Sequence, residues 1–376
     1  MQYRETIHSM TRRCRNWDYR RPGAYMVMIS MADRGRDWLG HLVQEEGEWR
    51  IRPTRLGEAV ADCWRKIGVN WPGVDPNVLQ LMPDHLHGIL LVLAMQLHPL
   101  GHIIGSFKAK STAAARMLPG AELPPGVKAG GSLWSPGFQD SILWSDERYR
   151  KSLAYLLDNP RRLAVKRSHP ELFRMVRDIA VDLGAGRIGH FSAIGNHFLL
   201  SKSMAQVQVS RRDFGYLRMR SRDGKAPEVV RDQTGTPRIA FQTKEYAARK
   251  AAYFAAAQGG AVLLSPCVSD GERQIAREAL SAGLPLVTMH NKGFSKLQKP
   301  PGLYFDACAA GRLLMLAPIA WPYQPGKKPM TRADALAMNR LCQWLAGEGA
   351  ADLHYRGMQL GDIDALAHTA ARIRTR

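Results

Sequence analysis

The sequence predicts two domains: an α+β domain whose sheet is mainly antiparallel, followed by an α/β domain with a parallel sheet. At 376 residues the chain is long for one domain, and 45% hydrophobic residues are enough for two cores. In the first half, segments with strand or helix spacing follow in the order strand, strand, helix, strand, helix, strand, helix. In the second half, helices alternate with short, continuously apolar segments, which is typical of strands buried in a parallel sheet.

The first domain is expected to cover residues 1–178, with a linker at 179–189. Thr54 is expected to cap a helix with its hydroxyl group, and Pro160 to end another, because proline has no backbone N–H. The expected elements are a strand at 24–31, a turn and a second strand around 38–43 and 49–52, a helix at 55–67, a strand or hairpin at 74–92, a helix at 100–117, a strand region at 133–144 and a helix at 147–158. A further helix is expected at 171–181.

The second domain is expected to cover residues 190–376. Ser269 is expected to begin one of its helices, directly after an apolar strand. The expected elements are a helix at 246–258, a strand at 261–265, a helix at 269–282, a strand at 284–289, a helix or strand at 305–316 and a closing helix at 332–347.

The net charge of +20 favours a polyanionic partner, of which nucleic acid is the commonest, with an anionic membrane surface as the alternative. The stretch around Arg12 and Arg13 is basic and aromatic, so it is interpreted equally as a solvated arm or as an arm that contacts DNA. No apolar run is long enough to span a bilayer, and the N-terminus has no apolar signal core. We therefore expect a soluble, cytoplasmic protein associated with the nucleoid.

A histidine pair lies in the apolar run that begins at Leu81. His85 and His87 would lie on one face of a strand, because residues two apart in a strand point the same way. That is the geometry of two neighbouring metal ligands. Such a pair can also arise by chance in a chain with 12 histidines, so two inert polar residues at a strand end are the alternative.

A tyrosine and an asparagine share one face of the helix that begins near residue 147. Tyr155 and Asn159 are four residues apart, so a phenol and an amide would lie close together, with Arg161 and Arg162 just beyond. A packing tyrosine and a helix stop are the alternative interpretation. Tyr149 is the competing nucleophile, but it lies about 240° away around the helix, so both phenols cannot face one metal equally.

Four sequence blocks together resemble the HUH single-tyrosine transposases, and most closely their branch associated with repetitive palindromes. The blocks occur in order over residues 1–178, and the first has Asp84 where the family usually has asparagine. They are Met82-Pro83-Asp84-His85-Leu86-His87-Gly88, Ile104-Gly105-Ser106-Phe107-Lys108, Trp134 with Phe138-Gln139-Asp140-Ser141-Ile142-Leu143, and Tyr155-Leu156-Leu157-Asp158-Asn159-Pro160.

This resemblance implies a ferredoxin-like fold and a metal-dependent endonuclease and strand-transferase that acts on hairpin or palindromic single-stranded DNA. His85 and His87 match the histidine pair of the family, Asn159 its third metal ligand, and Tyr155 the nucleophile that forms a covalent 5′-phosphotyrosine. Two imidazoles and an amide suit Mn²⁺ better than Mg²⁺, and we expect either ion in use. The side chains expected to contact the DNA are Arg12, Arg13, Lys108, Lys110, Arg161 and Arg162.

The second domain is similar, more loosely, to the Rossmann-like group that includes the DNA-processing protein DprA and the nucleotide-sensing SLOG domains. Ser210 and Arg211 fall where that group has a Gly-Ser-Arg turn, with Val209 in place of its glycine. Ser269 and Gly271 begin a helix at the end of a strand, where backbone N–H groups can bind phosphate. These residues are candidates for a nucleotide site, with an ordinary cap and turn as the alternative.

Two other functions remain open at this stage. A domesticated protein could bind structured single strands without cutting them. A zinc-dependent hydrolase of the amidohydrolase type also uses two such histidines, but its fold needs eight strand-helix repeats that do not follow here. The sequence leaves a monomer and a homodimer equally open.

Overall fold

The computed structural model describes residue 14 and residues 17–220, 227–232, 235–295, 298–326, 328–347 and 359–375. The chain divides into two compact units, Met1–Val165 and Lys166–Arg376. The first has antiparallel sheets and the second a mixed sheet that contains parallel strands. The expected combination of an antiparallel first half and parallel strands in the second half is confirmed at this level.

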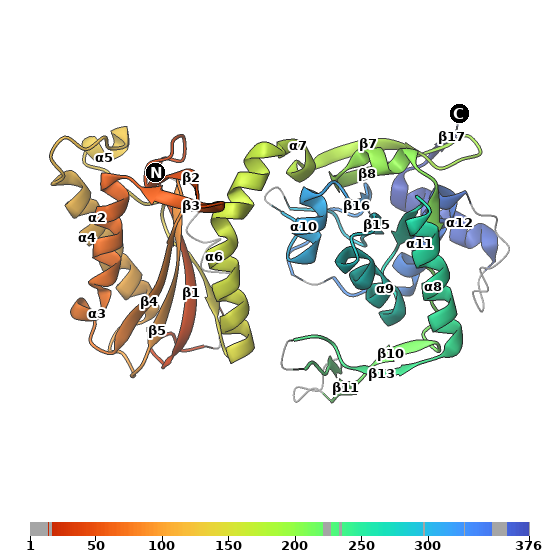
Figure 1. Ribbon diagram of the computed structural model, residues 1–376, viewed down its shortest axis with the longest axis horizontal. Coiled ribbons are helices and arrows are strands. Elements are labelled where there is room, and N and C mark those ends of the chain that lie inside the picture. Colours follow the sequence, from red (N-terminus) through yellow and green to blue (C-terminus); the bar gives the residue numbers. More distant parts are fainter. Residues whose placement is uncertain are drawn as a thin grey trace. The chain divides into compact units, whose positions relative to one another are not determined.

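A four-stranded antiparallel sheet forms the centre of the first unit, with the order β4-β5-β1-β6 (Figure 1). Its strands are β1 (Gly23–Ser30), β4 (Val74–Leu81), β5 (His85–Val92) and β6 (Gln139–Ile142). Within the sheet, His87 pairs with Met28 on one side and with Gln80 on the other. Because side chains alternate between the faces, His85, His87 and Ile89 share one face of β5.

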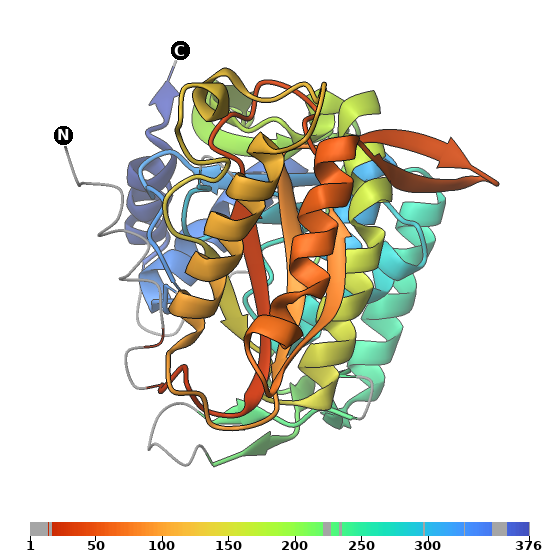
Figure 2. The same ribbon diagram turned by 90° about the vertical axis from the view of Figure 1, so that its left-hand side faces the viewer.

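Helices cover both faces of this sheet (Figures 1 and 2). The helices α2 (Arg55–Arg65) and α4 (Leu100–Arg116) lie on one face, and α6 (Asp146–Ser168) lies on the other. On the α2 side, Trp64 packs directly on Gly88, where a Cβ atom would come within 2.3 Å of the indole ring. On the α6 side, Ile89 packs with Leu156. The histidine pair therefore lies on the face that α6 covers.

A separate hairpin of β2 (Gly40–Glu45) and β3 (Glu48–Pro53) extends beyond the main sheet (Figure 2). The helix α2 follows it directly, and the Oγ1 atom of Thr54 accepts a hydrogen bond from the backbone N–H of Gly57 at 3.1 Å. The predicted cap is confirmed. The short helices α3 (Ile67–Asn70) and α5 (Pro125–Lys128) complete the unit.

The expectation that Pro160 ends its helix is wrong, because α6 continues to Ser168. A proline inside a helix removes one backbone hydrogen bond and costs about 3 kcal/mol. Here Leu156, Pro160 and Ala164 are all buried, so packing along one side of α6 offsets this cost. As a result, Asn159 lies within the helix, one turn after Tyr155.

The helix expected at 171–181 is also absent from the described structure, which has α7 (Pro170–Phe173) followed by the strand β7 (Val176–Asp182). The strand pairs with β8 (Arg187–Gly195), and an irregularity lies between Val176 and Ile179. Val176 and Ile179 are three residues apart and both pair with β8 because of this irregularity. A spacing of three between apolar residues is also typical of a helix, so the sequence pattern was ambiguous. Residues 179–189, expected as a linker, therefore form the turn region of this hairpin.

A mixed sheet with the order β17-β8-β16-β15-β14-β9 forms the centre of the second unit. Four of its strands run parallel, and they are β9 (Met204–Gln206), β14 (Val262–Ser265), β15 (Leu286–Met289) and β16 (Leu313–Pro318). Every residue of β14, β15 and β16 is buried, which explains their continuously apolar sequences. The strands β8 and β17 (Arg374–Thr375) extend the sheet in antiparallel fashion.

The remaining elements of the second unit are helices around this sheet and two small hairpins. The helices are α8 (Lys244–Gln258), α9 (Asp270–Ser281), α10 (Leu303–Ala309), α11 (Arg332–Ala346) and α12 (Leu360–Ala371), with the 3-10 helix η1 (His197–Ser201). The hairpins pair β10 (Phe214–Tyr216) with β13 (Ile239–Gln242) and β11 (Arg218–Met219) with β12 (Glu228–Val229). Among the helices that the structure describes, none has the length and apolar character needed to cross a membrane.

Candidate functional site

The two histidines of β5 point their ring nitrogens at each other. The Nε2 atoms of His85 and His87 lie 3.2 Å apart. His85 is partly buried and His87 is only 5% exposed. Two imidazole nitrogens at this separation either share a proton or ligate one cation, so the predicted pairing on one face of the strand is confirmed in its geometry.

Asp84 holds the ring of His85 in a fixed orientation. Its carboxylate lies 2.6 Å from Nδ1 of His85 and accepts a second hydrogen bond from Nε of Arg34, also at 2.6 Å. Burial works to raise the pKa of the Asp84 carboxyl, but these hydrogen bonds outweigh it and hold the pKa well below its ordinary value. The ionised carboxylate therefore fixes the proton of His85 on Nδ1 and leaves the lone pair on Nε2.

Tyr155 lies directly beside this pair. The ring centroids of Tyr155 and His87 are 5.9 Å apart, with the planes almost perpendicular at 86°. The tyrosine is 42% exposed, so its phenol is open to a ligand from solution. The guanidinium carbon of Arg162 lies 5.6 Å from the centre of the same ring, which brings a positive charge to the phenol.

Asn159, the residue predicted as a third ligand, lies within α6 one turn after Tyr155. It is 7% exposed, and its buried Nδ2 atom has no hydrogen-bond partner in the described structure. A buried N–H donor without a partner is costly, but an amide ligates a cation through its oxygen, so this nitrogen does not itself point to a metal. No group of three or more His, Cys, Asp or Glu residues that could hold a metal occurs in the described ranges.

The competing tyrosine has a different position. The hydroxyl of Tyr149 donates to Oδ1 of Asn77 at 2.6 Å, and its ring packs against the small core under α6. Tyr155 is the phenol whose ring contacts the histidine pair.

The basic residues expected to bind DNA fall into different environments. The ammonium of Lys108 donates to the carbonyls of Ser135 and Gly137 at 2.5 and 2.9 Å, and burial lowers its pKa. Lys110 donates to the side chain of Asn70, and Arg161 pairs with Asp158 at 2.5 Å. The structure thus brings only Arg162 of this set against the candidate nucleophile, while Arg12 and Arg13 lie outside the described residues.

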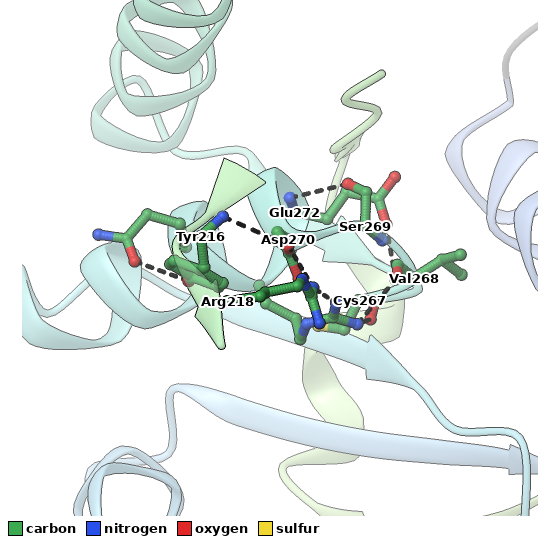
Figure 3. Close-up of polar contacts among 9 residues, drawn as sticks. Tyr216, Arg218, Cys267, Val268, Ser269, Asp270 and Glu272 are labelled. Atoms are coloured by element: carbon green, nitrogen blue, oxygen red, sulfur yellow. Dashed lines mark hydrogen bonds and ion pairs between the residues drawn. The ribbon is translucent and has the colours of Figure 1, made fainter. Parts of the chain in front are cut away.

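The second unit has a pocket of about 480 Å³ at the N-terminus of α9, and Arg211 and Ser269 line it. Its other arginines, Arg218 and Arg273, are bound by Asp270 at 2.6 and 2.5 Å (Figure 3). Ser210 and Gly271 are not among the residues that line it. At Gly271 a Cβ atom would lie 2.4 Å from Cγ1 of Val209, so this glycine permits close packing of α9.

A carboxylate of the protein itself occupies the N–H groups at the start of α9. Glu272 is 4% exposed and accepts backbone N–H bonds from Val268 at 2.7 Å and Ser269 at 3.0 Å (Figure 3). It accepts a third from Val209 at 3.4 Å. Burial raises the pKa of Glu272, and the N–H bonds oppose that rise. Glu272 thus satisfies the N–H groups of Val268 and Ser269 in a capping box, and Ser269 Oγ accepts from the N–H of Glu272 at 3.1 Å. The nucleotide site stays a prediction.

Two functional candidates escaped the sequence analysis. Asp84 was noticed only as a departure from a family pattern, although a carboxylate next to a candidate histidine ligand is a signal for a partner that orients it. Arg34 is fifty positions away in the sequence, and no local pattern connects it with Asp84.

No protein-family model matches the chain. An uncharacterised protein of Haemophilus influenzae is 24% identical over 173 residues, which are 41% of this chain and 88% of that protein. Among solved structures, a REP-associated tyrosine transposase bound to a REP hairpin is 16% identical, covers 40% of this chain and 73% of its own, and has a TM-score of 0.29. A Deinococcus radiodurans protein assigned as a transposase is 19% identical, covers 40% of this chain and 97% of its own, and has a TM-score of 0.23. This likeness is distant, so the functional assignment depends on the site residues themselves.

Proposed function

We propose that the first unit is a metal-assisted endonuclease and strand-transferase that acts on structured single-stranded DNA through Tyr155. One observation carries the proposal: the Nε2 atoms of His85 and His87 converge to 3.2 Å directly beside the ring of an exposed tyrosine. The carboxylate of Asp84 adds support, because it fixes the tautomer of His85 and so directs the Nε2 lone pair toward His87.

In this proposal His85, His87 and Asn159 hold a divalent cation, Mn²⁺ or Mg²⁺. When bound, that cation neutralises phosphate oxygens and orients the phosphodiester. The ligand set fits the donor types present, since the Nε2 atoms of His85 and His87 converge and Asn159, one helical turn after Tyr155, carries an amide oxygen.

Tyr155 is the proposed nucleophile. Its Oη atom forms a bond to phosphorus, the bond from phosphorus to the 3′ oxygen breaks, and the departing 3′ hydroxyl takes up one proton for the phenolic proton released. Arg162 favours the transition state because its charge lies near the developing negative charge on the phenol and phosphate. The product, a 5′-phosphotyrosine, keeps the bond energy and allows strand transfer to a second 3′ hydroxyl.

The topology of the first unit supports the ferredoxin-like part of the proposal. The order β4-β5-β1-β6 has α2 between β1 and β4 in the chain, and α4 between β5 and β6. This is a β-α-β-β-α-β arrangement with both connecting helices on one face. It leaves the opposite face, with the histidine pair, for α6.

The test is incubation of the full chain with a library of single-stranded DNA hairpins in the presence of Mn²⁺. A covalent protein-DNA band that survives denaturation supports the proposal. Retained binding without cleavage or a band would instead indicate a non-cleaving DNA-binding protein.

For the second unit, we propose the pocket at Arg211 and Ser269 as the place to test for a nucleotide ligand. Three arginines line it, and Asp270 compensates only part of their charge. A thermal-shift screen with nucleotides and with single-stranded DNA tests this, and the absence of a shift with any nucleotide would retire the idea.

A further inference from the structure

A second groove of about 650 Å³ lies beside the candidate active site of the first unit. The hairpin strand β3 contributes Trp49 and Arg50 to its lining, β4 contributes Gln80, and α6 contributes Asp158 and Arg161. Nothing in the proposed chemistry uses this groove.

The groove is connected to the site through two of these residues. Gln80 is the direct cross-strand partner of His87, so both side chains emerge on the same face of the sheet. Asp158 lies 3.8 Å from Arg162, whose guanidinium stands over the ring of Tyr155. Asp158 therefore connects the two places, and a DNA strand bound at Tyr155 would reach the groove on passing this residue.

The charges in the groove do not favour a phosphate. Arg50 is paired with Glu48 at 2.9 Å, and Arg161 is paired with Asp158 through two bonds of 2.5 and 2.9 Å. Each positive charge of the lining thus has a negative partner within the same lining. A phosphate would have to compete with these carboxylates, whereas an uncharged group would not.

The remaining groups suit a nucleobase. Trp49 is partly exposed and offers an indole face for stacking, which every base can use. The amide nitrogen of Gln80 donates to the carbonyl of Leu81 at 2.8 Å, and its amide oxygen is an acceptor that a base edge can use. An aromatic face with charge-compensated polar neighbours is therefore better matched to a base than to the backbone.

We propose that this groove binds one unpaired base of the DNA strand that is held at Tyr155, with Trp49 as its stacking platform. The proposal rests on the proposed function only for the identity of the strand. It adds a place where side chains of the protein recognise a base of the DNA directly.

The test measures binding by full-length protein that carries Tyr155→Phe, so that the DNA is not consumed. The probes are fluorescent DNA hairpins with a single-stranded tail at the 5′ or the 3′ end, a blunt hairpin, and tailed hairpins with one abasic site moved stepwise along the tail. The protein variants add Trp49→Ala, Trp49→Phe or, as a matched control, Trp144→Ala. Trp144 is 64% exposed and lies under Arg148, away from the groove lining.

We expect Trp49→Ala to weaken binding of one tailed hairpin by about 5-fold to 150-fold, the loss of one base-aromatic stack, while Trp49→Phe keeps most of the affinity. The blunt hairpin and the Trp144→Ala protein should change less than about 2-fold. One abasic position should weaken binding to protein with Trp49 and have no further effect in Trp49→Ala, because both changes remove the same contact.

An abasic scan in which no position is coupled to Trp49 overturns the groove proposal, even if Tyr155 forms a covalent adduct in protein with the tyrosine intact. Conversely, coupling at one position without any adduct supports the groove and rejects the proposed catalysis. Failure of both the Tyr155→Phe protein and the unsubstituted protein to bind any of the hairpins rejects both.

Discussion

The two units contain two sites that look alike in sequence and differ in how far the protein satisfies its own polar groups. Both place polar residues at strand or helix ends, His85 and His87 in the first unit and Ser269 in the second. At the start of α9, the carboxylate of Glu272 accepts from the N–H groups of Val268 and Ser269. Under α6, the Nε2 atoms of His85 and His87 face each other at 3.2 Å, an arrangement that a shared proton or a bound cation would satisfy. Polar residues with a similar sequence pattern can therefore be satisfied by the protein in one place and left open to a ligand in another.

The largest effect on DNA cleavage is expected from Tyr155→Phe in the first unit. Removal of the hydroxyl removes the attacking oxygen, so the covalent adduct with single-stranded DNA should be lost completely. The measurement is denaturing electrophoresis of the protein after incubation with labelled hairpin DNA and Mn²⁺. Tyr149→Phe is the matched control, since its hydroxyl is bound to Asn77, and it should leave the adduct within about 3-fold of the unsubstituted protein. An adduct that survives Tyr155→Phe would disprove the assignment of the nucleophile.

The next effect is expected from His85→Ala, which removes one of the two converging nitrogens. Cation stabilisation of a transferring phosphate is worth several kcal/mol, so the Mn²⁺-dependent rate of adduct formation should fall on the order of 10³-fold. Calorimetric titration with Mn²⁺ should show the corresponding loss of binding. His41→Ala, an exposed histidine on β2, serves as the control and should change neither quantity. Unchanged Mn²⁺ affinity in His85→Ala would mean that this pair is not a metal site.

A smaller effect is expected from Asp84→Ala, because Asp84 orients His85 and would not itself contact the cation. Loss of such a partner typically weakens metal affinity about 10-fold to 100-fold. Asp84→Asn should recover part of the loss, since its amide oxygen can still accept a hydrogen bond from the Nδ1–H group of His85. Mn²⁺ titration of both variants checks this, with Asp33→Asn in the neighbouring loop as the control. Equal losses in the alanine and asparagine variants would show that the charge of Asp84, rather than its acceptor, orients the ring.

Some of the residues in these predictions could be predicted from the sequence, and others could not. The shared face of His85 and His87 follows from the two-residue period of a strand, and the proximity of Tyr155 and Asn159 from the helical turn. Both patterns are local, so both were predictable, as was the cap at Thr54.

Contacts between distant segments were not predictable in this way. The contact of Arg34 with Asp84 and the groove between β3 and α6 depend on how whole elements pack. The continuation of α6 through Pro160 has the same origin, because burial of one helix side outweighs a local preference. The strand β7 was mistaken for a helix because an irregularity in its pairing changed the apparent period.

The smallest effect on DNA cleavage is expected from Glu272→Gln in the second unit. This variant tests whether the start of α9 is satisfied by the protein itself. If Glu272 is only an internal partner for the N–H groups of Val268 and Ser269, its substitution should leave adduct formation at Tyr155 unchanged. Glutamine keeps one oxygen but turns an NH₂ group toward backbone donors, so the free energy of unfolding of this unit should fall by about 1–3 kcal/mol.

Urea denaturation followed by circular dichroism measures that loss. Glu278→Gln is the matched control on the same helix, because Glu278 is partly exposed and pairs with Lys250 at 2.9 Å, so it should cost under about 1 kcal/mol. A Glu272→Gln protein that keeps its stability and gains affinity for inorganic phosphate would reverse the contrast between the two sites. The start of α9 would then be a ligand site that Glu272 closes, and the second unit would have an anion-binding function of its own.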